Sequence, residues 1–137
     1  MDLNLELKEF TIDRSKWRCG GDSNSKLGEG YTQLLNKKGY MCCLGQIAAQ
    51  MGFDKESIKN IGEPADIDGL NEIIADEFLL ARVADYHHLD DENHLYYNSD
   101  FAAELIRIND DNTIDTTERE RRIIEAAAKH NVTIKFQ

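Results

Sequence analysis

Long apolar runs and export signals are missing from this sequence. Hydrophobic residues make up 41% of its 137 residues, yet no uninterrupted stretch approaches the roughly 18–20 apolar residues that cross a bilayer. Residues Met1–Phe10 alternate leucine with polar residues, so they lack the apolar core of a signal peptide. We therefore expect a protein that is neither exported nor inserted into a membrane.

Cysteine and proline are scarce. The three cysteines are an odd number, and two of them, Cys42 and Cys43, are neighbours that cannot easily form an unstrained bridge to each other. We expect three reduced thiols, as is typical of a cytoplasmic protein. The length suits one domain that buries a core without disulfides or metal, so we expect a single acidic globular domain over residues 1–137.

Basic residues are nearly absent from one long segment. The net charge is −10, and residues 63–120 hold three Lys or Arg against 17 Asp or Glu, whereas residues 1–61 hold nine against eight. Phosphate contacts need Lys and Arg, so this segment is not expected to bind nucleic acid directly. The imbalance favours a partner with a basic surface. The alternative is a solvated surface that keeps a small protein soluble.

The apolar periodicity predicts an α+β fold, namely one helix-rich domain with a small sheet formed by the N- and C-terminal strands. Alternation over Leu3–Leu7 and again at Phe10 and Ile12 predicts an N-terminal strand, with a bulge or turn between the two runs. Residues Val132–Phe136 alternate in the same way and predict its partner. Residues 19–30 and 87–100 are polar and are predicted to be loops.

Five helices are expected between these strands. The first is predicted over residues 41–52, with Leu44, Ile47, Ala48 and Met51 inward. The second covers residues 55–60 and is capped by Asp54, and the third covers residues 69–85. The fourth is capped by Asn98 or Ser99 and carries Phe101, Leu105 and Ile108. The fifth follows a capping box of Thr117 and Glu120, with Ile123, Ile124, Ala127 and Ala128 inward. Gly52 and Asn131 are predicted to end the first and the last of these helices.

Two adjacent thiols at a predicted helix start are the first candidate for chemistry. Exposed N–H groups and the helix dipole at Cys42 and Cys43 favour a thiolate. The phrase GYMCCLGQIAAQMGF resembles the cysteine helix of NlpC/P60 peptidases, and His87, His88 and His94 follow it, which leaves a cysteine hydrolase open. The phrase lacks the Asp-Cys-Ser-Gly signature of those enzymes. Buried core cysteines are the other interpretation.

Metal and phosphate motifs are not found. The cysteine and histidine spacings do not suit zinc, residues 64–70 match only a fragment of a calcium loop, and the glycines of residues 20–30 fit no phosphate-binding loop. No cofactor is therefore predicted. If a pocket for a small anionic ligand exists, we expect it beside the glycine-rich loop, where aromatic, basic and thiol side chains gather: Trp17, Arg18, Tyr31, Cys42 and Cys43.

Four phrases in order carry a resemblance: FTIDRSKWRCGG, LLNKKGYMCCLGQIAAQMG, IRINDD and RERRIIEAAAKHNVTIKF. Together they resemble a group of small, largely uncharacterised proteins of tailed-phage and prophage genomes, with a Met-Cys-Cys-Leu-Gly helix and an Asn-Asp-Asp turn. The resemblance implies a phage protein acting in the cytoplasm of a bacterial host. It also implies that the shared positions are Trp17, Arg18, Cys42, Cys43, Asn109, Asp110 and Asp111.

The acidity and the resemblance together predict a non-catalytic inhibitor or modulator of a host protein with a basic surface, such as a nucleic-acid-binding defence effector of the CRISPR type. The partner-binding residues would be Glu63, Asp66, Asp68, Asp76, Glu77, Asp90, Asp91, Glu92, Asp110 and Asp111. Two alternatives stay open: a protein that sequesters a nucleotide immune signal at the pocket beside Trp17, and the cysteine hydrolase. The sequence does not predict an oligomeric state.

Overall fold

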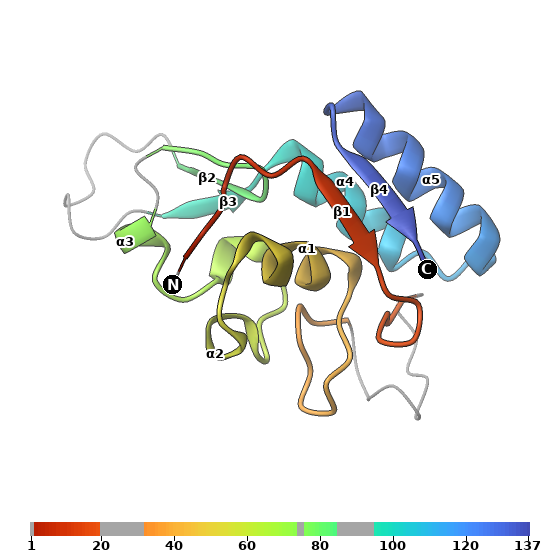
Figure 1. The fold of residues 1–137 in the computed structure, drawn as a ribbon, viewed down its shortest axis with the longest axis horizontal. Coiled ribbons are helices and arrows are strands. Elements are labelled where there is room, and N and C mark those ends of the chain that lie inside the picture. The colour runs from red at the N-terminus through yellow and green to blue at the C-terminus, as the bar shows by residue number, and fades with distance from the viewer. Residues whose placement is uncertain (1, 20–31, 74–75, 85–94) are drawn as a thin grey trace.

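The computed structural model describes residues 2–19, 32–73, 76–84 and 95–137. Its strands are β1 (Glu9–Ile12), β2 (Ala81–Val83), β3 (Tyr96–Asn98) and β4 (Thr133–Phe136). Its helices are α1 (Cys43–Met51), α2 (Lys55–Ile58), the 3₁₀ turn η1 (Pro64–Asp66), α3 (Leu70–Ile73), α4 (Asp100–Asn109) and α5 (Thr116–Lys129). This composition confirms the predicted α+β fold (Figure 1).

The two ends of the chain form one small sheet, as predicted. Strand β1 pairs with β4 in parallel, with Phe10 opposite Ile134 and Ile12 opposite Phe136. Helix α1 packs against β1, α5 packs against β4, and α4 contacts both helices. Alternate residues of β1 point inward, so that Phe10 and Ile12 are buried among these helices.

The leucines before β1 were predicted to be strand, and that prediction was wrong. Leu3, Leu5 and Leu7 are partly buried and their polar neighbours are exposed, so the alternation itself is present. The backbone N–H of Asn4, however, donates to the carbonyl of Met51 at 2.8 Å, at the end of α1. The segment is therefore held by a helix end and does not belong to a strand.

Helix α1 buries the predicted face, with Leu44, Ile47, Ala48 and Met51 all fully buried. Gly52 ends it in the left-handed region at φ 107°, as expected. Gly45 is required for packing, because a Cβ there would lie 1.7 Å from the carbonyl oxygen of Leu34. This close approach lets the chain before α1 lie directly on the helix.

The helix predicted over residues 69–85 was wrong over the described residues 76–84, and the loop predicted over residues 87–100 was wrong at Tyr96–Asn98. Residues 74–75 and 85–94 lie outside the described residues. Helix α3 is described only to Ile73, and residues 81–83 are the strand β2, which pairs antiparallel with β3. The N–H of Phe78 donates to the carbonyl of Ala81 at 2.9 Å, and this turn replaces the helix. The β-forming Tyr96 and Tyr97 supply the partner strand. Helix α2 is also shorter than predicted, because Asn60 turns the chain at φ 61°.

The two C-terminal helices start at side-chain caps. Ser99 accepts a hydrogen bond from the N–H of Ala102 at 3.0 Å, as predicted. For α5 the predicted capping box of Thr117 and Glu120 was wrong, since Asp115 is the cap and accepts from the N–H of Glu118 at 2.8 Å. Asn131 ends α5 with φ 61°, as predicted.

The inward face of α5 was only partly predicted. Ile123 and Ala127 are buried as expected, but Ile124 is 43% exposed and Ala128 lies on the surface. Arg119 and Ala126 take the remaining inward positions. The face is turned in this way because α5 packs against both α4 and β4.

Candidate functional site

Carboxylates that have no ion pair within the described residues gather at one end of the molecule. Between residues 63 and 84 six carboxylates accompany a single cation, Arg82. All six are exposed, and none forms an ion pair with the described part of the chain: Glu63, Asp66, Asp68, Glu72, Asp76 and Glu77, here called the acidic end. Arg82 lies over the ring of Tyr97, with its guanidinium carbon 5.5 Å from the ring centroid.

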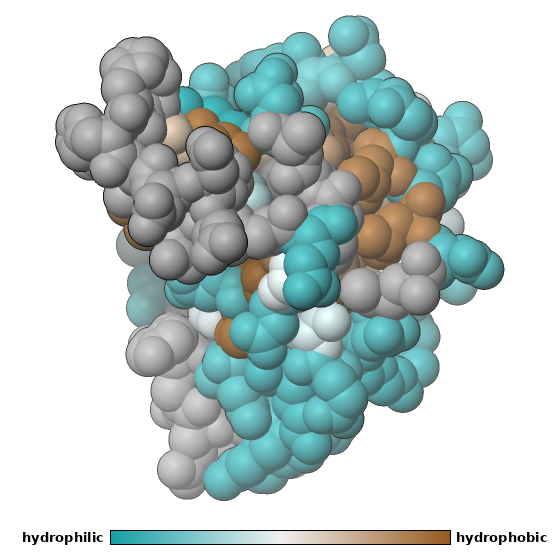
Figure 2. All heavy atoms as spheres, turned by 90° about the vertical axis from the view of Figure 1, so that its left-hand side faces the viewer, coloured by the Kyte–Doolittle hydropathy of each residue, from teal (hydrophilic) through white to brown (hydrophobic). Residues whose placement is uncertain are grey.

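The fold places these carboxylates together. The turn η1 packs against β2 and β3, and the side-chain oxygen of Asn98 in β3 accepts from the N–H of Ala65 in η1 at 2.9 Å. Figure 1 shows α3, β2 and β3 at one end of the molecule and α5 at the other. Figure 2 views the first of these ends, where hydrophilic residues cover most of the coloured surface between one larger and several small hydrophobic areas.

The remaining partner-binding candidates lie elsewhere or outside the described residues. Asp110 accepts hydrogen bonds from Thr32 and Asn109. Asp111 accepts from Thr113, from its N–H at 2.9 Å and from its hydroxyl at 2.6 Å, and these bonds lower the pKa of Asp111. Both carboxylates are half-buried and order the connection from α4 to α5. Asp90, Asp91 and Glu92 are outside the described residues.

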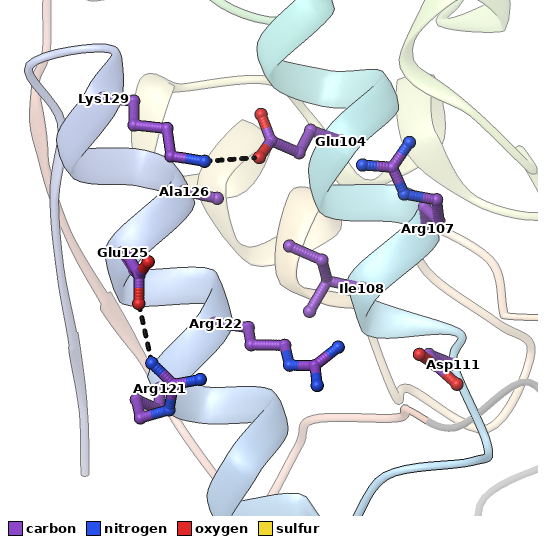
Figure 3. A pocket seen from close by; sticks show the side chains of 9 residues that line it. All are labelled: Glu104, Arg107, Ile108, Asp111, Arg121, Arg122, Glu125, Ala126 and Lys129. Carbon is purple, nitrogen blue, oxygen red and sulfur yellow. Dashed lines mark hydrogen bonds and ion pairs between the residues drawn. The ribbon is translucent and has the colours of Figure 1, made fainter.

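Three carboxylates on the α4–α5 face, Glu104, Glu118 and Glu125, have cationic partners. Lys129 lies 3.5 Å from Glu104, Arg121 lies 2.7 Å from Glu125, and Glu118 accepts from Arg121 and Arg122. These two arginines lower the pKa of Glu118 to about 2. Glu104, Arg121, Arg122, Glu125 and Lys129 help to line a groove between the two helices (Figure 3), which has a volume of about 360 Å³. Charge on this face is largely neutralised within the molecule, unlike that of the acidic end.

The side chains predicted to line a ligand pocket fill the core. Trp17 is 5% exposed and Arg18 is 2% exposed. Trp17 donates its indole N–H to the Oδ1 of Asn109 at 2.7 Å, and the backbone N–H of Cys43 donates to the same oxygen at 3.1 Å. Asn109 in turn donates to the carbonyl of Arg18 at 3.2 Å. Tyr31 and the glycine-rich loop lie outside the described residues.

A hollow beside this network is too small for a nucleotide. It is lined by Thr32, Cys42, Cys43, Leu44, Gly62, Ile106, Asn109 and Asp110, and its volume is about 10 Å³. Such a volume holds about one water molecule. The hydrogen bonds of Asn109, at the end of α4, connect this helix to the start of α1 and to the chain after β1, so its role here is structural.

Burial makes Cys42 and Cys43 poor nucleophiles. It raises the pKa of Cys42 to about 12 and that of Cys43 well above the usual thiol value, which outweighs the favourable helix N-terminus. Cys19 is half-buried, and burial raises its pKa although Arg119 opposes the shift. The core interpretation of the two neighbouring cysteines fits these surroundings, and the hydrolase interpretation does not.

Arg119 is a buried residue that apolar periodicity does not reveal. Only 4% exposed, it donates to the carbonyls of Asp111 and Ile114 and, at 3.3 Å, to the sulfur of Cys19. The one available signal is its position four residues before Ile123, on the inward face of α5. Its hydrogen bonds close the loop between α4 and α5.

Within the described residues, no group of three His, Cys, Asp or Glu side chains is arranged to hold a metal ion. The candidate bases His87, His88 and His94 are outside those residues. Among the described helices, none is long and apolar enough to cross a bilayer.

Comparison of the chain with models of protein families, with curated proteins and with solved structures gave no match. The likeness to phage proteins stays a prediction.

Proposed function

We propose that this chain is a non-catalytic, phage-encoded inhibitor or modulator of a host factor, which it binds through the acidic end. The partner is a host protein with a basic surface, such as a defence effector that binds nucleic acid. One observation carries the proposal: the six carboxylates of the acidic end lack cationic partners in the described chain, whereas Glu104, Glu118 and Glu125 of α4 and α5 are paired.

Unpaired charge is what a docking surface of this kind needs. Paired carboxylates cancel much of each other's field, but an uncompensated cluster attracts a basic surface over about 8 Å, the Debye length at physiological salt. Such a surface also competes with the phosphates that the same basic groove would otherwise bind. Binding would therefore block nucleic acid from the partner without any chemical step.

Neither alternative function is favoured by a specific observation. Sequestration of a nucleotide needs an accessible pocket beside Trp17, and that side chain is buried against Asn109. Hydrolysis by a cysteine needs a thiolate near neutral pH, and the raised pKa of Cys42 and Cys43 opposes it.

Charge neutralisation tests the proposal. The triple variant Asp66→Asn, Glu72→Gln, Asp76→Asn is compared with a control of equal charge change outside the acidic end, Glu9→Gln in β1 with Glu120→Gln and Glu125→Gln in α5. Host proteins captured by the wild-type chain are purified, and their affinity is measured from about 50 to about 500 mM salt. We expect the acidic-end variant to bind roughly tenfold more weakly, a loss of about 1.4 kcal/mol, and the control to bind as the wild type does.

Two results would contradict the proposal. One is binding that does not change with ionic strength. The other is an equal loss of affinity in both triple variants, which would show that net charge matters and its location does not.

A further inference from the structure

A groove with an apolar floor opens beside the acidic end. It has a volume of about 450 Å³ and is formed where four distant segments meet: the residues before β1, the turn before β2, the start of α4 and the end of α5. Its lining residues are Leu5, Glu6, Lys8, Glu77, Phe78, Leu79, Ser99, Asp100, Phe101 and His130. We call it the Leu5–Phe78 groove.

The floor is apolar and held in place. Leu5, Phe78 and Leu79 are partly exposed, and Phe101 lies beneath them at 2% exposure. The ring of Phe78 packs at 5.9 Å from that of Phe53, and the ring of Phe101 meets that of His130 edge-on at 5.5 Å. Partly exposed apolar side chains on a rigid base are typical of positions that receive an anchoring side chain.

The rim is predominantly acidic. Glu6, Glu77 and Asp100 are exposed, and none of them forms an ion pair with a described residue. Among the described residues that line the groove, Lys8 is the one permanent cation. His130 lies 3.6 Å from Glu104 on α4. Glu77 belongs both to this rim and to the acidic end, so the two surfaces are continuous.

We propose that the Leu5–Phe78 groove receives one bulky apolar side chain, flanked by Lys or Arg, from the partner that docks on the acidic end. This inference rests on the proposed function and adds an apolar contact to the charged contacts of the acidic end. Surface charge mainly speeds association and sets specificity, whereas a few buried apolar or aromatic side chains supply most of the affinity. A volume of about 450 Å³ lies in the lower part of the usual range for binding pockets, roughly 300–1,000 Å³.

Synthetic peptides provide the test, because they need no identified partner. The first is Lys-Lys-Trp-Leu-Lys-Lys with blocked ends; the second replaces Trp-Leu by Ala-Ala, and the third replaces every lysine by glutamate. Each is titrated into the ¹⁵N-labelled full chain at low salt. We expect the first peptide to shift the amides of Leu5, Leu79 and Asp100, the second to bind at least roughly tenfold more weakly, and the third not to bind.

Matched variants separate the groove from the rest of the surface. Leu5 is partly exposed and Glu6 is exposed. Leu5→Asn and Glu6→Lys should each lower the affinity of the chain for the first peptide several-fold. Their controls are Ile124→Asn, an exposed apolar residue of α5, and Glu9→Lys, an exposed acid of β1, which should bind as the wild type does.

The outcomes distinguish this inference from the proposed function. If the first two peptides bind equally and shift only residues 63–77, the groove inference fails and docking on the acidic end stands. If no lysine peptide binds even at low salt, both fail. If Leu5→Asn changes the sedimentation of the chain, a second copy occupies the groove, and the inference is again overturned.

Discussion

At the scale of single residues, the buried side chain of Asn109 forms hydrogen bonds through both its amide oxygen and its amide nitrogen. Its carbonyl oxygen accepts from Trp17 and from the backbone of Cys43, and its amide nitrogen donates to Arg18 and Asp110. A buried amide with both ends bonded fixes one packing arrangement of the elements around it. The likeness to phage proteins marked this position, but its role depends on contacts that no local pattern encodes.

Replacing Asn109 with Ala should cost roughly 2–4 kcal/mol of unfolding free energy, because it leaves the Trp17 indole and the Cys43 N–H without their acceptor in the core. Chemical denaturation measures the loss. Asn4→Ala, which removes an exposed hydrogen bond to the N–H of Glu6, should stay within about 0.5 kcal/mol of the wild type. Similar losses in the two variants would contradict the assigned role.

The three thiols should differ in reactivity in the folded protein. Burial raises the pKa of all three, so little thiolate exists at neutral pH and alkylation should speed up as the pH rises. Only Cys19 is partly exposed, and we expect iodoacetamide to modify it first. Cys42 and Cys43 should react only as the chain unfolds. Mass spectrometry of digested samples measures the rate at which each cysteine is labelled. Fast labelling of Cys42 or Cys43 in the folded protein would refute this order.

At the scale of elements, features that depend on neighbouring residues could be predicted from the sequence, whereas features that depend on distant contacts could not. The cap at Ser99 and the helix ends at Gly52 and Asn131 were predictable, because each depends on one residue and its immediate backbone. The hairpin of β2 and β3 was not. The apolar run at Phe78–Ala81 suits a helix or a buried strand equally well, and its partner strand lies beyond a polar segment that hides it.

The start of α5 gives a prediction about elements. Asp115→Ala should destabilise the protein by about 1 kcal/mol, because Asp115 accepts from the N–H of Glu118. Thr117→Ala should change stability by less than about 0.5 kcal/mol, since Thr117 lies inside the helix and is exposed. Thermal or urea unfolding of both variants checks the order. A larger loss for Thr117→Ala would restore the capping box that the sequence suggested.

At the scale of the whole molecule, the two ends differ mainly in whether their carboxylates form ion pairs within the described residues, and less in how many carboxylates they carry. Counting residues predicted an acidic segment over residues 63–120. Five of the six carboxylates of the acidic end were among the residues predicted to bind the partner, and Glu72 was not. The sequence did not reveal which acids would be neutralised. Arg121 lies three residues from Glu118 and four from Glu125, which is a local signal, but the contact between Lys129 and Glu104 joins two helices. Only folding creates the contrast between the two ends.

The sheet of β1 and β4 leads to a prediction about the whole chain. Removing residues 132–137 takes away Val132 and Ile134 from the core and Phe136 from its contact with Trp17, at 4.9 Å between ring centroids. Strand β1 then has no partner among the described strands, and we expect no cooperative thermal transition by circular dichroism. Lys135→Ala, at an exposed position of the same strand, should unfold like the wild type. A folded truncated chain would contradict the central place of this sheet.

The same pairing has a consequence for biosynthesis. Because Phe10 lies opposite Ile134, strand β1 leaves the ribosome long before its partner β4 has been made. Until then Phe10 and Ile12 are exposed on the nascent chain, and contacts so distant in sequence form slowly. During translation β1 therefore stays unpaired while the helix-forming segments emerge, and the sheet can form only after β4 has been made.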